Sequence, residues 1–348
     1  MPGLSVRDLN RTLLARQHLL ERTSMPALAM VEHLLGLQAQ DNLPPYLALA
    51  ARLDPFDPAE LSDALERRDA VRLLTMRGTI HMLTPDDALA LRPWVQPALD
   101  QVAKSNQMNR DARHVPVAEV VATAREILAD GPLPVKELGE RLAERFDAPP
   151  GALGHVARER APLVQVPPRG RWQRSGGVVY EHLETYLGRP ATEVDVHKLV
   201  RRYLRAFGPA TAADMTAWSR VTRLGTVFAE MADELEVVET DDGKKLYDVP
   251  GAPRVDGSVP APPRLLGAYD NVFLSHADRS RIVPHEHRNR WADTTVGIGH
   301  TVFIDGFFAG RWFWRDGAIS LDLFRDLSRR ERADLDDEVD RVTALLSA

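Results

Sequence analysis

The stretch Ala70–Leu83, AVRLLTMRGTIHML, decides how the first part of this chain is interpreted. Both of its arms are rich in β-branched and apolar residues, and Gly78 lies near the middle, so the pattern predicts a β-hairpin. The residues before it have helical periodicity. The helices expected there cover Ser5–Glu21, a segment beginning after Ser24, Tyr46–Leu53 and Leu61–Arg67. Helices followed by a two-stranded hairpin are the order of a winged helix.

The same order of helices and hairpin occurs twice more, which indicates an internal structural repeat. The second hairpin is expected over Leu163–Val179, and the third over Leu235–Val249, where DDGKK is a strong turn signal. After a Pro- and Gly-rich linker, β-rich stretches lead to a helix over Phe324–Leu346. We therefore predict an α+β fold, mainly α with β-hairpins. Its expected segments are winged helices over 1–112, 113–190 and 191–252, and a β-rich C-terminal domain with a closing helix over 253–348.

The composition excludes several classes of protein. The 348 residues include no cysteine, which excludes disulfides and thiolate chemistry and fits a cytoplasmic location. No signal peptide or membrane span is expected, because no apolar run is long enough. The net charge of −6 argues against a nucleic-acid coat protein, although an enzyme can still have a local basic groove. Between Arg158 and Arg205, ten positive side chains stand against five negative ones.

Basic and aromatic residues on the predicted hairpins are candidates for DNA contact, since winged helices bind duplex DNA with a helix and a wing. These candidates are Arg77 and His81 on the first hairpin, and Arg169, Arg171, Trp172 and Arg174 on the second. The arginines suit phosphate contacts, and the tryptophan can stack or wedge. The alternative for the second hairpin is a surface hairpin with one packed tryptophan.

No metal site or cofactor is expected. The histidines of His285-Glu286-His287 have suggestive spacing, but the sequence identifies no third ligand for them. The chain also lacks a phosphate-binding loop and a G-x-S-x-G nucleophile elbow.

A pair of glutamines lies in Gly36–Asn42, GLQAQDN, where a helix is expected to end. Side chains at positions i and i+2 point apart on a helix but share a face in extended backbone. Gln38 and Gln40 can therefore act together only if the helix has ended near Leu37. The alternative is two polar residues at a helix end, one capping and one solvated. Asp41 is a second catalytic candidate, because it would supply a carboxylate beside the glutamines.

Three motifs, LGLQAQD, TMRGTIHML and LLGAYDNVFLSHADRS, occur in this order along the chain. Together they resemble the winged-helix DNA glycosylase family of the AlkZ/YcaQ type, over nearly the full length. The glutamine–apolar–glutamine form of the first motif resembles the AlkZ-like branch, whereas the YcaQ-like branch has aspartate at the last position. The resemblance implies that Gln38 and Gln40 are catalytic. Ala39 is a small choice for the apolar position.

The resemblance also implies a substrate and a mechanism. Enzymes of this family excise alkylated purines, especially N7-alkylguanine, from double-stranded DNA, and some unhook interstrand crosslinks. Such a base is already cationic, so the enzyme has only to position water and to stabilise an oxocarbenium-like sugar. Lysines are scarce and absent from the motifs, so we expect a monofunctional enzyme without a Schiff base. We expect it to act as a monomer.

Two other functions agree with the same repeat. One is a transcription regulator that binds DNA through its winged helices without chemistry, and the other is a scaffold for protein contacts. Three winged helices in one chain argue against a simple dimeric regulator, which would use one per subunit. The basic bias between Arg158 and Arg205 argues mildly against the scaffold.

Overall fold

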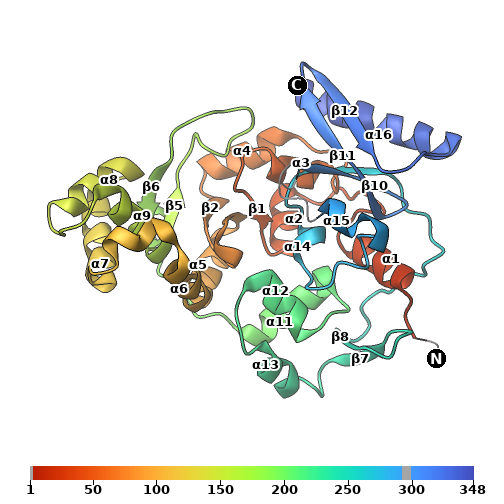
Figure 1. Cartoon of the computed structure of the whole chain (residues 1–348), viewed down its shortest axis with the longest axis horizontal. Helices are drawn as coiled ribbons and strands as arrows, with labels where there is room; N and C mark the ends of the chain where they lie inside the picture. The colour runs from red at the N-terminus through yellow and green to blue at the C-terminus, as the bar shows by residue number, and fades with distance from the viewer. Residues whose placement is uncertain (1–2, 292–298) are drawn as a thin grey trace.

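The computed structural model describes residues 3–291 and 299–348 and confirms the α+β class (Figure 1). In the first unit, helices precede a hairpin, as expected. Its elements are α1 (Val6–Arg16), α2 (Ala27–His33), α3 (Pro44–Ala50), α4 (Pro58–Glu66), β2 (Val71–Leu74) and β3 (Ile80–Leu83). Helix α1 ends five residues before the predicted Glu21. Helix α3 begins at Pro44, whose fixed φ suits a first helical turn.

The helices-then-hairpin order is repeated in the next two units. The second contains α7 (Val117–Ile127), β4 (Leu133–Pro134), α8 (Val135–Ala143), α9 (Pro150–Arg160), β5 (Leu163–Gln165) and β6 (Val179–His182). The third contains α11 (Val196–Phe207), α12 (Ala212–Ser219), α13 (Leu224–Glu230), β7 (Glu236–Glu239) and β8 (Lys245–Asp248). Between the first two units lie α5 (Pro85–Trp94), α6 (Gln96–Ser105) and the short helix η2 (Gln107–Ala112), and α10 (Leu183–Leu187) follows the second.

Each unit also has a short extended segment that pairs with its own hairpin. In the first unit it is β1 (Leu37–Gln38), which pairs with β3, and in the second it is β4, which pairs with β6. In the third, Ala210 forms a single bridge to Tyr247. These segments are too short to have a sequence pattern, and none was predicted. The first of them carries one of the two glutamines.

The hairpins of the first two units join in one sheet. Strands β2 and β5 pair antiparallel, which gives six strands in the order β1-β3-β2-β5-β6-β4. The predicted second hairpin, Leu163–Val179, contains only three strand residues before a long loop over 166–178. That loop crosses toward α4 of the first unit (Figure 1).

The C-terminal part is β-rich and ends in a helix, as expected. Strands β9 (Arg264–Leu266), β10 (His300–Ile304), β11 (Phe307–Arg315) and β12 (Ala318–Leu323) form a four-stranded antiparallel sheet, and α16 (Arg329–Ser347) packs against it. The short helices α14 (Asn271–Leu274), η4 (His285–His287) and α15 (Arg288–Trp291) lie between β9 and β10. None of the described helices is both long and apolar enough to cross a membrane.

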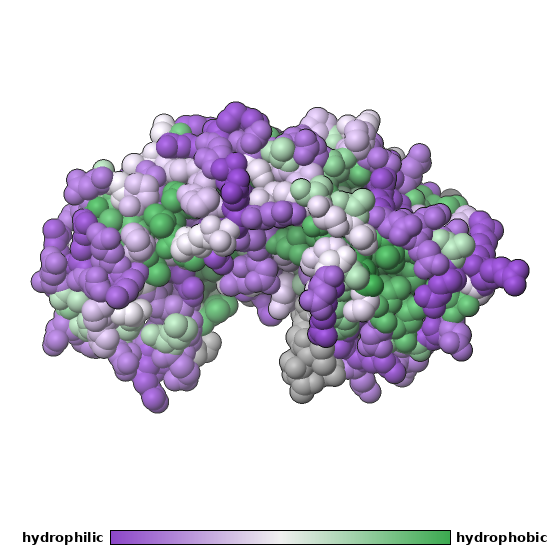
Figure 2. Space-filling view, turned by 90° about the horizontal axis from the view of Figure 1, so that it is seen from above, coloured by the Kyte–Doolittle hydropathy of each residue, from purple (hydrophilic) through white to green (hydrophobic). Residues whose placement is uncertain are grey.

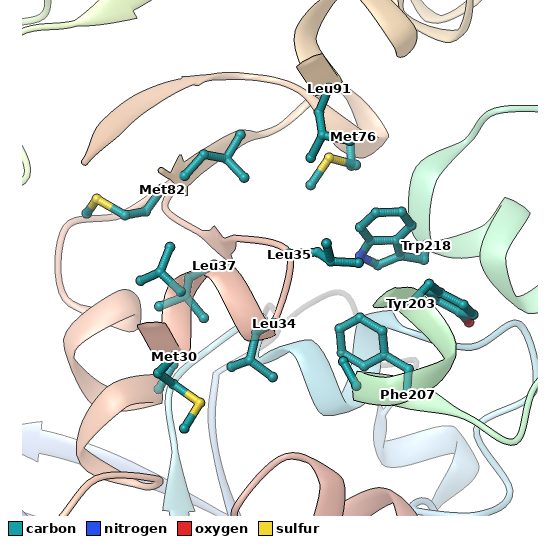
Figure 3. Close-up of a cluster of buried hydrophobic side chains, with 14 of the residues drawn as sticks. Met30, Leu34, Leu35, Leu37, Met76, Met82, Leu91, Tyr203, Phe207 and Trp218 are labelled. Atoms are coloured by element: carbon teal, nitrogen blue, oxygen red, sulfur yellow. The ribbon is translucent and has the colours of Figure 1, made fainter. Parts of the chain in front are cut away.

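One large hydrophobic core joins the first unit, the third unit and part of the C-terminal segment. Figure 3 shows this junction, with Leu35 from the end of α2 and Met76 from the first hairpin facing Trp218 of α12. Residues 112–180 have a core of their own, and their helices α7–α9 form the lobe at the left of Figure 1. One side of the molecule is hollowed between this lobe and the rest (Figure 2). The boundaries of the four predicted domains remain a prediction.

A fully buried ion pair connects the first unit to the C-terminal part. The two Nη atoms of Arg52 donate to the two carboxylate oxygens of Asp270, at 2.8 and 2.7 Å, and neither side chain is exposed. Arg52 also donates to the Ala48 carbonyl and the Gln17 side chain, so the buried charge has several partners. A pair of this kind depends on both members, because removal of one leaves the other charged and desolvated.

We expect Asp270→Asn to lower the free energy of unfolding by roughly 3–5 kcal/mol, because it leaves Arg52 without its counter-charge. Urea unfolding followed by circular dichroism measures this loss. The matched control is Asp69→Asn, since Asp69 pairs with Arg67 at 2.9 Å and the two side chains are 49% and 59% exposed. The control should change stability by less than about 1 kcal/mol. Equal losses in the two variants would contradict a structural role for the buried pair.

Candidate active site

The helix before the glutamines ends early enough for Gln38 and Gln40 to lie on extended backbone or in a loop. Helix α2 stops at His33, and Leu35 (φ +55°) and Gly36 (φ +95°) turn the chain in the left-handed region. The Gly36 N–H donates to the Val31 carbonyl at 2.9 Å, which closes the helix end. A Cβ on Gly36 would lie 2.4 Å from Cδ2 of Leu83, so this position requires glycine.

A side chain from the C-terminal part completes this turn. The amide nitrogen of Asn271 donates to the carbonyls of Leu34 and Gly36, at 3.1 and 2.8 Å. Carbonyl groups at a helix end have no partner within the helix, and buried ones need a donor from elsewhere. Asn271 follows the ion-paired Asp270, so the Arg52–Asp270 pair and the helix end are fixed together.

Gln38 lies on β1, opposite His81 of β3, and its side chain is held by the first hairpin. Nη2 of Arg77 donates to Oε1 of Gln38 at 3.0 Å and lies 2.9 Å from Nε2 of His81. The other ring nitrogen, Nδ1 of His81, donates to the Thr79 carbonyl at 3.0 Å, which leaves Nε2 to accept from Arg77. Burial, and then the charge of Arg77, lowers the pKa of His81 well below its ordinary value. The imidazole is therefore neutral at pH 7.

Gln40 also contacts the first hairpin. The Ile80 N–H donates to Oε1 of Gln40 at 3.2 Å, while the Ala39 N–H donates to the Ile80 carbonyl at 2.7 Å. Gln40 is exposed, whereas Gln38 is only 6% exposed. The condition set by the sequence is confirmed, because the helix has ended and both amides contact β3 or its turn. Each amide oxygen uses one of its two lone pairs in these bonds.

The residues after the motif are fixed by an arginine that the sequence did not single out. Arg72, on β2, donates to the Ala39 carbonyl at 2.6 Å and to Oδ1 of Asn42 at 2.9 Å. Burial, and then the charge of Arg169, lowers the pKa of Arg72 to about 10, so it stays protonated at neutral pH. Asp41 is exposed between these two anchored positions.

The predicted DNA contacts on the second hairpin lie in the loop over 166–178, which packs on the first unit. Trp172 packs against Tyr46, with ring centroids 5.0 Å apart, and its backbone N–H donates to Oγ of Ser62. This is the packed-tryptophan alternative, and it arises because α3 and α4 offer an apolar surface beside the loop. Arg171 pairs with Glu66 at 2.8 Å.

The other two arginines of this loop differ in exposure. Arg169 donates to the Gly176 carbonyl at 3.3 Å. The side chain of Arg174 is exposed, and its backbone carbonyl accepts from Asn42 at 3.3 Å. Gly170 (φ +94°) approaches Arg72 so closely that a Cβ there would lie 2.4 Å from the Arg72 Cδ.

Arg77 and His81, the candidates on the first hairpin, support Gln38 from inside the protein. His81 is 1% exposed, so its ring does not reach a DNA backbone in this conformation. Arg77 is half-buried and donates to Gln38 and, through Nη1, to the Trp218 carbonyl at 2.6 Å. Arginine and histidine on a wing suit DNA contact and internal support equally well, and only the structure distinguishes these roles.

One further residue near Asp41 was not identified as a site residue from the sequence. Nδ1 of His300 accepts from the Ala268 N–H at 3.0 Å, and its ring stacks on Trp312 with centroids 4.4 Å apart. Burial lowers the pKa of His300 to about 4, and the charge of Asp41 acts in the opposite direction. Within residues 3–291 and 299–348, no three histidine, cysteine or carboxylate side chains are grouped to bind a metal.

The site therefore presents neutral amides in a basic setting. Both glutamines can accept a hydrogen bond from water through the remaining lone pair, and among the described residues neither is hydrogen-bonded to a carboxylate. Arg72 and Arg77 lie behind the motif and carry positive charge. Such an arrangement suits a polar reactant that brings negative charge with it.

We expect Gly36→Ala to destabilise the protein, by about 1–2 kcal/mol for the left-handed backbone and about 1–3 kcal/mol for the contact with Leu83. Urea unfolding measures the change. The control is Gly151→Ala, because Gly151 is exposed in α9 and a Cβ there meets nothing within 4 Å. That variant should gain about 0.4–1 kcal/mol. A neutral result for Gly36→Ala would show that the turn does not need glycine.

The sequence and the fold of this chain are similar to those of known DNA glycosylases. An interstrand DNA cross-link repair glycosylase of Streptomyces sahachiroi is 25% identical over 332 residues, which cover 90% of this chain and 89% of that protein. The solved structure of the DNA glycosylase AlkZ of Streptomyces sahachiroi shares the fold, with a TM-score of 0.81 over 98% of this chain and 97% of that one, at 23% identity. The model of the family described as "DNA glycosylase AlkZ-like" matches residues 31–345. The chain therefore belongs to the AlkZ-like DNA glycosylase family.

Proposed function

We propose that this DNA glycosylase hydrolyses the N-glycosidic bond of alkylated purines of the N7-alkylguanine type in double-stranded DNA. Gln38 and Gln40 position the attacking water, and the reaction leaves an abasic site. The observation that supports this most is the pair of amide oxygens on extended backbone, each held by one donor and each with a free lone pair.

The substrate class follows from the chemistry that neutral amides can perform. An amide is a poor acid, so it cannot protonate the leaving base. A base alkylated at N7 needs no such proton, because it is already cationic and leaves as a neutral molecule. What remains is to orient water at C1′ and to stabilise an oxocarbenium-like sugar, for which preorganised oxygen dipoles are suited.

Asp41 is the second candidate for this task. It is exposed and next to Gln40, and its electrostatic influence reaches His300. A carboxylate there can stabilise the positive charge on the sugar or accept a proton from the water. We propose it as an auxiliary residue, because the hydrogen bonds that fix the motif involve the glutamines and not Asp41.

Interstrand crosslinks are a further proposed substrate. The Streptomyces relative is named as a cross-link repair glycosylase, and it aligns with most of this chain. A crosslinked purine carries the second strand with it, so it needs an open surface more than an enclosed pocket. The hollowed side in Figure 2 provides such an open surface. We propose that Arg174, whose side chain is exposed at the end of the loop, contacts the DNA backbone.

We expect Gln38→Ala and Gln40→Ala each to slow single-turnover release of 7-methylguanine by at least about 100-fold, as removal of a transition-state contact does. DNA binding should change little, because phosphate contacts dominate affinity. Gln40→Asp should retain more activity than Gln40→Ala, since aspartate keeps an acceptor at that position. Full activity in the double alanine variant would refute the proposed role.

A matched control separates this effect from a general loss of glutamine. Gln101 is exposed in α6 and accepts from Lys104 at 3.3 Å. Gln101→Ala should release 7-methylguanine at the wild-type rate. Release of the free base is measured by chromatography, so strand cleavage is not needed for the readout.

We expect no covalent intermediate, because a bifunctional glycosylase needs an amine nucleophile and no lysine occurs in Gly36–Asn42 or Ala70–Leu83. Incubation with alkylated DNA and borohydride should yield no trapped protein–DNA adduct. The control is the same mixture heated in alkali, which should cleave the strand at the abasic site. A borohydride-dependent adduct would contradict the monofunctional mechanism.

A further inference from the structure

Arg77 connects two units of the chain through its guanidinium group. The residue lies in the turn of the first hairpin, and Nη1 donates to the carbonyl of Trp218, in the last turn of α12, at 2.6 Å. Nη2 donates to Oε1 of Gln38 at 3.0 Å and lies 2.9 Å from Nε2 of His81. One side chain therefore joins the end of a helix in the third unit to the first glutamine of the motif.

The hydrogen-bond partners of Arg77 are neutral, unlike those of the buried arginines that hold the fold together. Arg16 and Arg52 each form an ion pair with a buried aspartate. Within the part of the chain that the structure describes, Arg77 forms no ion pair with a carboxylate. The carbonyl end of α12 carries partial negative charge and compensates the guanidinium in part. A cation placed on neutral acceptors is costly to desolvate, which argues for a role beyond packing.

The contact with Arg77 decides which end of the Gln38 amide faces the hairpin. A guanidinium has donors and no acceptor, so the atom that it approaches has to be the amide oxygen. His81 supports this arrangement, because Nδ1 donates to the Thr79 carbonyl and Nε2 then accepts from the same Nη2. The two hydrogens of Nη2 are thus divided between Gln38 and His81. The amide nitrogen of Gln38 and the second lone pair of its oxygen are left for water or substrate.

The turn that carries Arg77 is packed against the third unit. Arg77 and Gly78 both have left-handed backbone, with φ of +58° and +70°. Met76, the residue before them, faces Trp218 in the shared core (Figure 3). Nη1 and Nη2 belong to one planar group, so the bond to the Trp218 carbonyl also fixes the donor to Gln38.

We propose that Arg77 is a positioning residue for base release, which holds the Gln38 amide in one orientation from its anchor on α12. This proposal rests on the proposed function for the role of Gln38, but it concerns a contact within the protein. A catalytic group that is misplaced by about 1 Å can slow a reaction by about 100-fold.

The test uses Arg77→Met in the full-length protein, because methionine removes the charge and all donors but remains unbranched. Single-turnover release of 7-methylguanine should be slowed by about 10- to 100-fold. Affinity for an undamaged duplex should change by less than about threefold, because phosphate contacts dominate it. Arg77→Lys is the second variant, and it should also be slow, since an ammonium group lacks the planar fork that serves Trp218 and Gln38 together. Wild-type rates in both variants would overturn the proposal.

The matched control is Arg92→Met. Arg92 is also buried, and it donates to the carbonyls of Glu159 and Ala161, at 3.2 and 3.1 Å. Its hydrogen-bond partners are neutral and lie outside the catalytic motif. Arg92→Met should lower the melting temperature and still release 7-methylguanine at the wild-type rate. Equal slowing in Arg77→Met and Arg92→Met would point to a general effect of a lost buried arginine and overturn the proposal.

Double variants separate positioning from a structural role. If Arg77 acts through Gln38, then Arg77→Met should add less than about threefold slowing to Gln38→Ala. It should slow Gln40→Ala by a larger factor, because that variant keeps the Gln38 amide. The same factor in both backgrounds would contradict an action through Gln38.

A spectroscopic readout does not depend on base release. The side-chain amide of Gln38 gives proton resonances in a heteronuclear NMR spectrum, identified by their absence from Gln38→Ala. They should shift in Arg77→Met and stay in place in Arg92→Met, since the first variant alone loses the donor to this amide. Resonances that do not shift in Arg77→Met would overturn the proposal. If wild type releases no base but the resonances shift as expected, the proposed function fails and the positioning contact stands.

Discussion

Asn271 donates its amide to two carbonyls at the end of α2, and the position of both glutamines depends on these bonds. The helix has to end inside the protein, where its last carbonyls need donors from outside. Asn271 can supply them only because Asp270, its neighbour, is held by Arg52 in a buried pair. The C-terminal motif is thus the structural support of the N-terminal one, although more than 200 residues separate them.

At this site the uncharged amides of two glutamines lie next to two charged arginines. The glutamines present oxygen dipoles that need no ionisation, while Arg72 and Arg77 fix the backbone and the first amide from behind. His81 stays neutral because it is buried beside Arg77, so it serves as an acceptor and not as an acid. Family membership selects the enzyme over the regulator and the scaffold that the sequence left open. The protein combines a negative total charge with basic character where the motif lies.

Local features were predictable from the sequence, and pairings across the chain were not. The first hairpin and the end of α2 have their own signals, in β-rich arms and in Gly36, and both were found. The helix expected from Tyr46 begins two residues earlier, at Pro44, because proline suits a first helical turn. Strand β1 has two residues and no pattern of its own. The bond from Arg77 to Gln38 joins residues 39 apart, and residue types alone cannot reveal it.

The close approach of Gly170 to Arg72 limits how the units of this protein can be exchanged. The loop of the second unit contacts the first unit through Gly170, Trp172 and the Arg174 carbonyl. Arg72, which lies against Gly170, also donates to Asn42, just after the motif. A chimera that takes the second unit from another member of the family must therefore bring a loop that is compatible with Asn42, Tyr46 and Arg72 of the first unit. The three helix-and-hairpin units are repeats in sequence order, but the first two are not interchangeable modules.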